Sequence, residues 1–236
     1  MSVDVLAVVH GANVPAGTFA DVVGERGHAL DVWSLAWDVP PPLPLDEYGA
    51  VLVLGGAMHA DQDDLHPWLR MENLFLQRLL ALHVPVLGVC LGAQLIAKAA
   101  HAEVRPASEP EVGWVEVELT EEAALDPLLG ELPDRFDAFE WHFYSYDLPA
   151  GATELARSRV CTQAFRLGDA AWGVQFHPEV TLDVVSSWAR EPTAQLPSPE
   201  DAFLAEAAER IEGWTALGRT LCGSFLDVAE RVGAPV

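Results

Sequence analysis

The sequence is poor in basic residues. It has 13 Lys and Arg against 36 Asp and Glu among 236 residues, which gives a formal net charge of -23. A field of this sign repels the phosphate backbone of nucleic acids and the headgroups of anionic lipids. We therefore expect neither a nucleic acid nor a membrane as a partner.

Cysteine is also scarce. Cys90, Cys161 and Cys222 are an odd number without close spacing, so neither a disulfide framework nor a zinc knuckle is expected. Residues 1–4 lack the basic start of a signal peptide, and the longest nearly uncharged apolar stretch, 84–97, is too short to cross a bilayer. These absences predict a protein of the reducing cytoplasm.

Large apolar side chains, in contrast, are plentiful. Half of the residues are hydrophobic, and eight Trp and nine Phe are among them. Burial of such side chains can offset the conformational entropy that a chain loses on folding. The length allows one α/β domain with additions or two small domains. Because we find no internal repeat and no clear linker, we expect one domain, with the segment 192–199 as a candidate hinge.

The first hundred residues alternate between short apolar runs and helical patterns. The apolar runs predict strands at residues 3–9, 28–34, 48–54 and 85–89. Apolar residues spaced by three and four predict a helix over residues 68–82. A segment that ends on glycine predicts a short helix over residues 18–27, and an alanine-rich segment predicts one over residues 91–100. Short apolar strands separated by helices are typical of a parallel sheet with crossover helices. The pattern therefore predicts an α/β fold.

The second half has a different pattern. Alternating runs predict strands, antiparallel at first, at residues 114–119, 136–141, 163–167 and 171–176. After residue 181 the pattern is helical again, although Gly213, Gly218 and Gly223 could divide this part into two pieces. We expect residues 191–236 to form a helical extension packed on a domain of residues 1–190. Its apolar stripe could instead form a dimer or partner surface.

The first candidate catalytic residue is Cys90, between an expected strand and an expected helix. The segment Gly88-Val89-Cys90-Leu91-Gly92 has the form of a nucleophile elbow, in which the glycines permit a tight turn that exposes the middle side chain. The positive end of the helix dipole there favours the reactive thiolate. The alternative is that Cys90 is a buried small hydrophobe and that the glycines only allow close packing.

The second candidate site is the segment 173–179, where an apolar strand ends at His177 and Glu179 follows two residues later. His177 could accept the thiol proton and return it to a leaving amine, while Glu179 orients the imidazole. The alternative is a histidine at a strand end, followed by a proline turn and a solvated glutamate. Together with Cys90, the pair lies where parallel-sheet proteins place their sites.

A third signal is the pair Gly55-Gly56 at the end of another expected strand. Glycines there leave backbone N–H groups free to approach a substrate, and with the Leu91 amide they could hold the oxyanion of a tetrahedral intermediate. The alternative is an ordinary turn.

In order and spacing, the segments 54–56, 85–94 and 175–179 resemble those of the class I glutamine amidotransferases, such as the amidotransferase domain of GMP synthase. The resemblance covers roughly residues 3–190. It implies a flavodoxin-like three-layer fold with a mostly parallel sheet, a small antiparallel extension and a C-terminal helical segment. It also implies a Cys-His-Glu triad that releases ammonia from glutamine through a γ-glutamyl thioester, with no cofactor and no metal.

By this resemblance Cys90 is the nucleophile, His177 the base and Glu179 its partner, while Gly56 and Leu91 donate to the oxyanion. The expected substrate-binding residues are Gly55, Gln94, Trp141 and His142. For Gln94 the alternative is a helix residue that faces solvent.

Some features differ from the family pattern. His142 is followed by Phe143-Tyr144-Ser145 where related domains have Gly-Asp, which predicts a more aromatic pocket. No synthetase domain follows in residues 191–236. The resemblance therefore leaves three alternatives: a glutaminase that supplies ammonia to a synthetase made as a separate chain, a γ-glutamyl peptidase or hydrolase, and a regulatory protein without turnover. The expected ligand is glutamine or another small γ-glutamyl compound, and a homodimer remains an alternative.

The other histidines gave weaker signals. His59 and His66 flank three aspartates at positions 61, 63 and 64, but their spacing matches no specific metal-ligand pattern, so we expect an acidic surface loop. His10 follows the first expected strand and would lie at the same edge of the sheet as Cys90.

Overall fold

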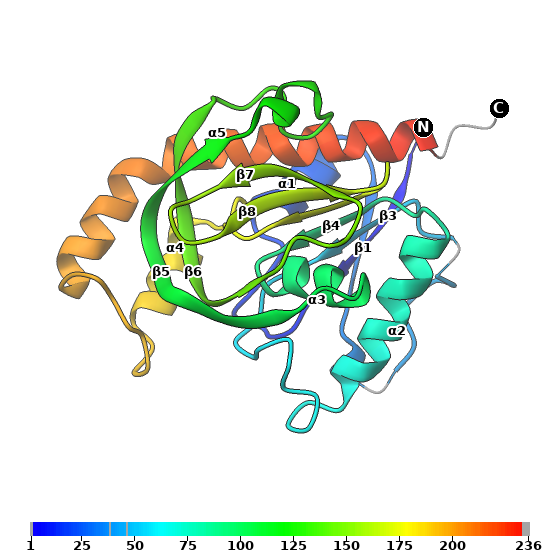
Figure 1. The fold of residues 1–236 in the computed structure, drawn as a ribbon, viewed down its shortest axis with the longest axis horizontal. Helices are drawn as coiled ribbons and strands as arrows, with labels where there is room; N and C mark the ends of the chain where they lie inside the picture. The colour runs from blue at the N-terminus through cyan, green and yellow to red at the C-terminus, as the bar shows by residue number, and fades with distance from the viewer. Residues whose placement is uncertain (1, 38, 46, 233–236) are drawn as a thin grey trace.

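The computed structural model describes residues 2–37, 39–45 and 47–232. A nine-stranded mixed sheet runs through the molecule in the order β2-β1-β3-β4-β9-β8-β7-β5-β6 (Figure 1). Its parallel part consists of β1 (Asp4–Val8), β2 (Ala29–Trp33), β3 (Ala50–Val53), β4 (Val86–Val89) and β9 (Ala171–Val174). These strands match the predicted apolar runs, and all four residues of β3, β4 and β9 are buried.

The antiparallel part consists of β5 (Val104–Leu119), β6 (Arg135–Tyr146), β7 (Ala152–Arg157) and β8 (Thr162–Leu167). The strands β5 and β6, of 16 and 12 residues, curl around one edge of the molecule (Figure 1). Both are longer than the predicted ranges, and β7 was not predicted. The strand β9 joins the two parts, because it pairs in parallel with β4 and antiparallel with β8.

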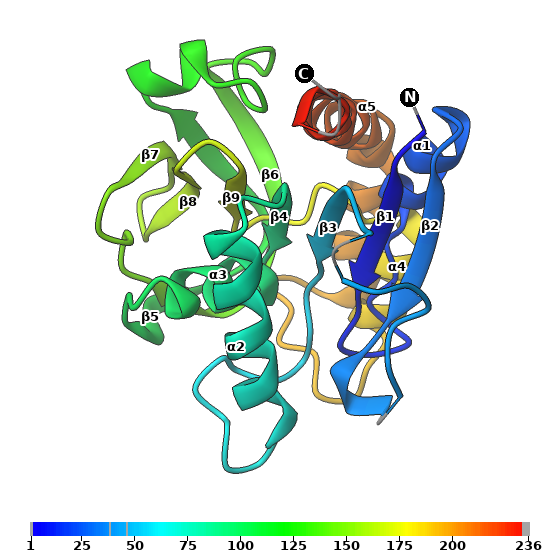
Figure 2. The same ribbon diagram turned by 90° about the vertical axis from the view of Figure 1, so that its right-hand side faces the viewer.

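Helices cover both faces of the parallel strands (Figure 2). One face is covered by α1 (Thr18–Glu25), α4 (Leu182–Ala189) and α5 (Glu200–Val232), and the other by α2 (Trp68–Ala81) and α3 (Leu91–Ala99). Two short 3₁₀ helices, η1 (Leu35–Trp37) and η2 (Glu121–Leu125), lie in connections. The result is the expected three-layer α/β arrangement.

Alternation along the strands explains why both faces have a core. Val5 and Ala7 of β1 belong to the apolar cluster under α1 and α5, whereas Leu6 and Val8 belong to the cluster under α2 and α3. All four side chains are fully buried. Burial of one Val or Leu side chain contributes about 1.5–3 kcal/mol, so a strand that is apolar on both sides is stable only between two layers.

The C-terminal helix is continuous. α5 runs for 33 residues across most of the width of Figure 1, and none of its three glycines divides it. It packs on α1 and α4. At Gly218 a Cβ atom would lie 1.9 Å from the carbonyl oxygen of Pro178, so this glycine lets α5 lie directly against the segment that contains His177. Among the helices of the described residues, none combines the length and apolar character needed to span a membrane.

Candidate active site

Cys90 lies in a strained turn between β4 and α3. Its backbone has φ 51° and ψ -107°, a positive φ that non-glycine residues rarely adopt. The Cys90 N–H donates to the carbonyl oxygen of Val174 on β9 (2.8 Å), and its own carbonyl accepts from the Gln94 N–H in α3 (3.1 Å). The neighbouring strand and the helix therefore hold the turn in this conformation.

The glycines of the elbow serve close packing, as the alternative explanation proposed. A Cβ atom on Gly92 would lie 1.9 Å from the Val53 carbonyl oxygen, and one on Gly88 would lie 2.6 Å from the Gly92 carbonyl carbon. This packing does not close off the cysteine. Cys90 is 6% exposed and lines a pocket at the carboxyl edge of the parallel strands.

His177 and Glu179 form a buried pair next to this cysteine. His177 Nδ1 lies 2.8 Å from Glu179 Oε1, and both side chains are almost fully buried. The backbone around them is fixed: the His177 carbonyl accepts from Trp214 Nε1 of α5 (2.8 Å), and the Glu179 carbonyl accepts from the Thr18 N–H (2.9 Å). Helices from both ends of the chain thus position this pair.

The charges at the site favour a protonated imidazole. Burial by itself lowers the pKa of His177, but the negative charges of Glu179 and Cys90, with hydrogen bonds to both, raise the pKa well above its ordinary value. Because Nδ1 donates to Glu179, Nε2 is the ring nitrogen left to meet the sulfur. A protonated imidazole here can give a proton to a leaving group, and it faces the residue whose thiolate form would act as a nucleophile.

The Gly55-Gly56 turn lies beside both groups. A Cβ atom on Gly55 would lie 3.0 Å from Cε1 of His177, and one on Gly56 would lie 2.8 Å from Leu91 Cδ2. In the part of the chain that the structure describes, neither the Gly56 N–H nor the Leu91 N–H donates to another backbone group. Both residues line the pocket, so these two N–H groups are free to meet a ligand oxygen.

His10 supports this turn from outside the pocket. Its Nδ1 lies 3.0 Å from the Gly55 carbonyl oxygen and its Nε2 lies 2.9 Å from Glu72 Oε1, in a fully buried glutamate of α2. Burial lowers the pKa of His10, but Glu72 raises it to a net value above the ordinary one. His10 is not among the residues that line the pocket.

The pocket has a volume of about 200 Å³. Its wall is made of Asn13, Val14, residues 56–59, Cys90, Leu91, Gln94, residues 141–144, His177, Trp188, Glu191 and residues 193–195. Aromatic side chains are frequent in this wall, and none of its described residues is Lys or Arg. The pocket is therefore more suited to a small uncharged or zwitterionic ligand than to a phosphate.

The expected substrate-binding residues occupy different places. Gln94 lines the pocket and is buried, with its Nε2 donating to the Tyr144 carbonyl (3.1 Å) and to Gln175 Oε1 (3.2 Å), so it does not face solvent. The Trp141 carbonyl oxygen lies 3.9 Å from Cys90 Sγ. Gly55 is not among the residues that line the pocket, and a Cβ atom on it would lie 3.0 Å from Cε1 of His177.

His142 lines the pocket, but its two ring nitrogens are already engaged. Nδ1 lies 2.9 Å from the Tyr144 carbonyl oxygen, and Nε2 lies 3.0 Å from Glu111 Oε2. His142 therefore forms part of the wall and has no ring nitrogen left to bind a substrate.

Several wall residues had no sequence signal. The Trp188 ring stands edge-on to His177 with ring centroids 5.0 Å apart. The His59 ring stacks on Tyr144 at 3.9 Å, and Glu191 accepts a hydrogen bond from Asn13 Nδ2 (2.8 Å) at the rim. The candidate hinge contributes its residues 193–195 to the wall. These contacts join positions far apart in the chain, which no local motif indicates.

The acidic loop near His59 has its own ion pairs. Asp63 pairs with Lys98 (2.7 Å) and Asp64 with Arg70 (2.6 Å). These contacts fit the expected acidic surface loop before α2.

The fold and the site together define a flavodoxin-like α/β protein with a cysteine elbow, a His-Glu pair beside the sulfur and free N–H groups facing the same pocket. The model of the family "Glutamine amidotransferase class-I" matches residues 18–187. The chain belongs to this family, as its resemblance had indicated.

Relatives agree with this assignment. The glutamine amidotransferase-like protein YfeJ of Salmonella typhimurium is 27% identical over 88% of this chain and 88% of its own length. A gamma-glutamyl-L-1-hydroxyisopropylamide hydrolase of a Pseudomonas species is 32% identical over 59% of this chain, and the match spans 50% of that protein. One subunit of the glutamine-hydrolyzing GMP synthase of Methanothermobacter thermautotrophicus is 34% identical, over 60% of this chain and 74% of that protein.

Solved structures share the whole fold. The crystal structure of a glutamine amidotransferase from Thermotoga maritima superposes with a TM-score of 0.88 at 30% identity. The match covers 96% of this chain and 99% of that chain, so α5 and the curled strands are part of a fold that the two proteins share.

Proposed function

We propose that this protein hydrolyses a γ-glutamyl amide bond through a thioester on Cys90. The observation that supports this most directly is the convergence of three groups at one pocket: the Cys90 sulfur, the His177-Glu179 pair, and the free N–H groups of Gly56 and Leu91. This set contains a nucleophile, an acid-base group with its orienting carboxylate, and an oxyanion site.

In the first half of the reaction the Cys90 thiolate attacks the side-chain carbonyl carbon of the γ-glutamyl group. The C=O electron pair moves to the oxygen, where the Gly56 and Leu91 N–H groups stabilise the charge. His177 donates its Nε2 proton to the leaving nitrogen, the C–N bond breaks, and ammonia or an amine departs. A γ-glutamyl thioester remains on Cys90.

In the second half a water molecule replaces the amine. His177, now neutral, takes a proton from the water as its oxygen attacks the thioester carbonyl. The C–S bond breaks, glutamate leaves, and the thiolate and imidazolium are restored. Glu179, bonded to His177 Nδ1, orients the imidazole and stabilises its protonated form in both halves.

The wall composition favours a second candidate within the same chemistry, which is the hydrolysis of N-substituted γ-glutamyl amides. Met58, Trp141, Phe143 and Tyr144 give the pocket an apolar side on which an alkyl or aryl amine could pack. The related Pseudomonas protein is named for a substrate of this kind. If glutamine is the substrate instead, ammonia could pass to a synthetase on a separate chain, the arrangement that the relatives named as GMP synthase subunits suggest.

The test uses the purified chain with glutamine, γ-glutamyl peptides and γ-glutamyl alkylamides, and measures glutamate release. Peptides with an α-linked glutamyl residue are the matched control, since they have the same atoms with the amide in the wrong place. We expect turnover of γ-linked compounds only. The ratio of kcat/KM between alkylamides and glutamine decides between the two candidates, and ammonia release only after a partner is added would favour a role with a synthetase.

Two variants test the role of Cys90. Cys90→Ala should abolish turnover while the fold is retained, and His177→Asn should cost nearly as much. Ordinary activity in Cys90→Ala would exclude the mechanism. A regulatory protein without turnover is the remaining alternative, and a wild-type chain that a glutamine-like electrophile fails to label at neutral pH would support it.

A further inference from the structure

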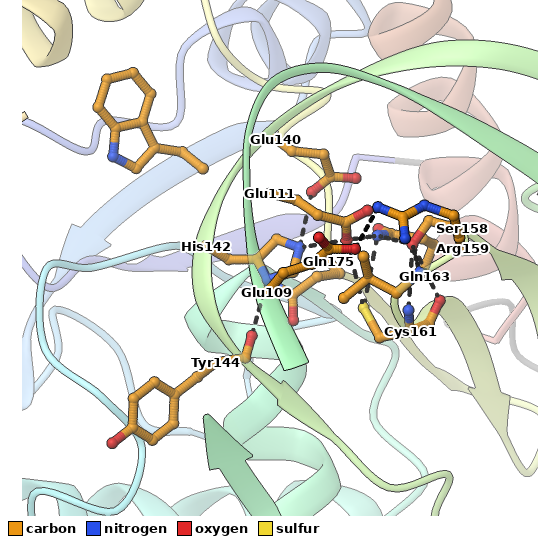
Figure 3. A network of polar contacts seen from close by, with 12 residues as sticks. Glu109, Glu111, Glu140, His142, Tyr144, Ser158, Arg159, Cys161, Gln163 and Gln175 are labelled. Atoms are coloured by element: carbon orange, nitrogen blue, oxygen red, sulfur yellow. Dashed lines mark hydrogen bonds and ion pairs between the residues drawn. The ribbon is translucent and has the colours of Figure 1, made fainter. Parts of the chain in front are cut away.

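A second cluster of reactive side chains lies within the network of polar contacts drawn in Figure 3, and it includes His142 of the pocket wall. It consists of Glu111 on β5, His142 on β6 and Cys161 just before β8. Glu111 Oε2, a ring nitrogen of His142 and the Cys161 sulfur all lie within 4.8 Å of one another. Glu111 and His142 are directly opposite each other in the β5-β6 ladder, so the sheet itself fixes their approach.

The hydrogen bond between His142 Nδ1 and the Tyr144 carbonyl leaves the other ring nitrogen, Nε2, directed into the cluster. Nδ1 lies 2.9 Å from the Tyr144 carbonyl oxygen. A carbonyl oxygen can only accept, so Nδ1 has the hydrogen and donates it. Nε2 points at Glu111 Oε2, 3.0 Å away, so a metal ion bound here would take the place of a proton between these two atoms. Histidines that bind metals are commonly held by this kind of hydrogen bond from the other ring nitrogen.

Glu140 supplies an independent observation. Its side chain is completely buried, and neither of its carboxylate oxygens has a hydrogen-bond partner among the described residues. Its Oε2 lies 3.5 Å from His142 Nε2, the nitrogen that also faces Glu111. A buried carboxyl group that accepts no hydrogen bond is costly, and a cation bound in this cluster would satisfy it.

We propose that this cluster is a binding site for a divalent transition metal of the zinc class. A thiolate, an imidazole and carboxylates are the ligands that Zn²⁺ takes, in tetrahedral geometry. Bonds of about 2.1 Å place tetrahedral ligand atoms about 3.4 Å apart. The atoms of His142 and Glu111 are 3.0 Å apart and those of Cys161 and Glu111 are 3.7 Å apart, so small movements would accommodate an ion.

A metal ion has a route to the cluster, and the proton that it would displace has a place to go. A hollow of about 390 Å³ next to the cluster is lined by Glu111, Val112, Arg159 and Val160. Binding would release the Cys161 thiol proton to solvent as the metal-sulfur bond forms, with no change of oxidation state. The sequence spacing could not indicate this site, because two of its ligands come from separate strands and the third from the turn before β8. The resemblance gave no metal either.

The site would stabilise the wall of the pocket. Glu140 and His142 flank Trp141 on β6, and the Trp141 carbonyl oxygen faces the Cys90 sulfur. A metal bound behind the strand would therefore fix the position of this wall residue. The proposal does not depend on which amide is hydrolysed, or on whether hydrolysis occurs.

Cobalt(II) is the probe for this site, in a Cys90→Ala background that removes the sulfur of the pocket as a competing ligand. The full-length variant is freed of metal with a chelator and titrated with Co²⁺. We expect thiolate-to-cobalt charge-transfer absorption that saturates at one ion per chain, and displacement of the cobalt by Zn²⁺. Absence of this absorption would overturn the proposal.

Matched variants assign the ligands. Adding Cys161→Ser should remove the charge-transfer band and weaken cobalt binding at least tenfold, whereas adding Cys222→Ala, at a buried cysteine of α5, should change neither. A band that persists at full strength in the Cys161→Ser chain would refute the assignment. Should that chain fail to fold by circular dichroism, Glu111→Gln decides: we expect affinity to fall about tenfold with the band retained, and unchanged affinity would refute the site.

Discussion

Cys90 has a backbone conformation that its surroundings enforce. A non-glycine residue at positive φ costs about 1–3 kcal/mol, and here the bonds to Val174 and Gln94 maintain it. The conformation turns the side chain from the strand into the pocket, above the start of α3. The strain and the accessibility of the sulfur thus have the same origin, which is a one-residue joint between β4 and α3.

The His177-Glu179 pair leads to a prediction about pH. Glu179 helps to raise the pKa of His177. In the proposed mechanism, protonated His177 is the form that donates to the leaving amine. Replacing Glu179 with Gln removes that charge and lowers the pKa of His177. The alkaline limb of kcat/KM should therefore move to lower pH, and kcat should fall by about ten- to hundredfold, less than the full contribution of an acid-base group.

Measured pH profiles of both proteins would check this. Glu191→Gln makes the same change of charge at the rim of the pocket and should leave the alkaline limb in place. An unchanged limb in Glu179→Gln would show that this carboxylate does not set the titration of the imidazole.

Glu191 has a predicted role of its own. It is the carboxylate in the pocket wall, and Asn13 Nδ2 holds its Oε1. We expect it to attract the α-ammonium group of a γ-glutamyl substrate. Because Glu191 is exposed, the interaction is worth only about 0.2–1 kcal/mol. Glu191→Gln should raise KM by about 1.4- to fivefold with kcat unchanged. Steady-state kinetics test this, and an unchanged KM would contradict it.

At the residue scale, the sequence indicated those site residues that belong to local motifs. Cys90, His177 and Glu179 each follow a short apolar strand, so their arrival at one edge of the sheet could be expected. Glu72 and Trp188 could not be found in this way. Each touches the site through a contact between distant segments, and nothing in its own neighbourhood in the sequence distinguishes it from an ordinary residue of an amphipathic helix.

At the scale of elements, α5 gives the sharpest prediction. Gly218 and Gly213 are both inside this helix, but a Cβ atom on Gly218 would lie 1.9 Å from the Pro178 carbonyl oxygen, whereas one on Gly213 would meet nothing within 4 Å. Gly218→Ala should destabilise the protein by about 1–3 kcal/mol through overpacking. Gly213→Ala should stabilise it by about 0.5–1 kcal/mol, because glycine inside a helix is costly.

Urea unfolding of both variants measures these changes. Pro178 lies between His177 and Glu179, so Gly218→Ala should also lower kcat under conditions where it stays folded. Equal stability of the Gly218→Ala chain and the wild type would show that α5 does not press on this segment.

The same helix shows where prediction of elements succeeded and where it did not. Apolar periodicity indicated α2, an alanine-rich segment indicated α3, and short apolar runs indicated the parallel strands, because each of these signals is local. The continuity of α5 was not evident, since the three glycines have low helix propensity and only tertiary contact explains Gly218. The lengths of β5 and β6 were underestimated because much of β5 is exposed, so its pattern lacks the apolar alternation that identifies a strand.

At the scale of the whole molecule, the layers explain why the site needs both ends of the chain. The parallel strands place Cys90 and His177 at one edge of the sheet, while α1 and α5 bond to the backbone around His177 and Glu179. The sheet alone would bring the reacting groups together, and the helices fix their orientation. We therefore expect the proposed activity to depend on the stability of the whole fold.

The net charge of -23 leads to a prediction about that stability. Like charges on a compact chain repel one another more than on an unfolded one, and salt screens this repulsion with a Debye length of about 10 Å at 0.1 M. Raising the salt concentration from about 10 mM to about 0.3 M should therefore stabilise the fold. A gain of about 1 kcal/mol would raise the Tm by about 2–4 °C for a chain of this size.

Thermal unfolding in sodium chloride and in choline chloride, each with a chelator present, separates screening from cation binding. Screening depends on ionic strength alone, so both salts should give the same rise. A rise in sodium chloride only would point to a bound sodium ion. A Tm that is flat or falls in both salts would mean that the ion pairs of the folded chain, such as those of the loop before α2, lose as much to screening as the acidic surface gains.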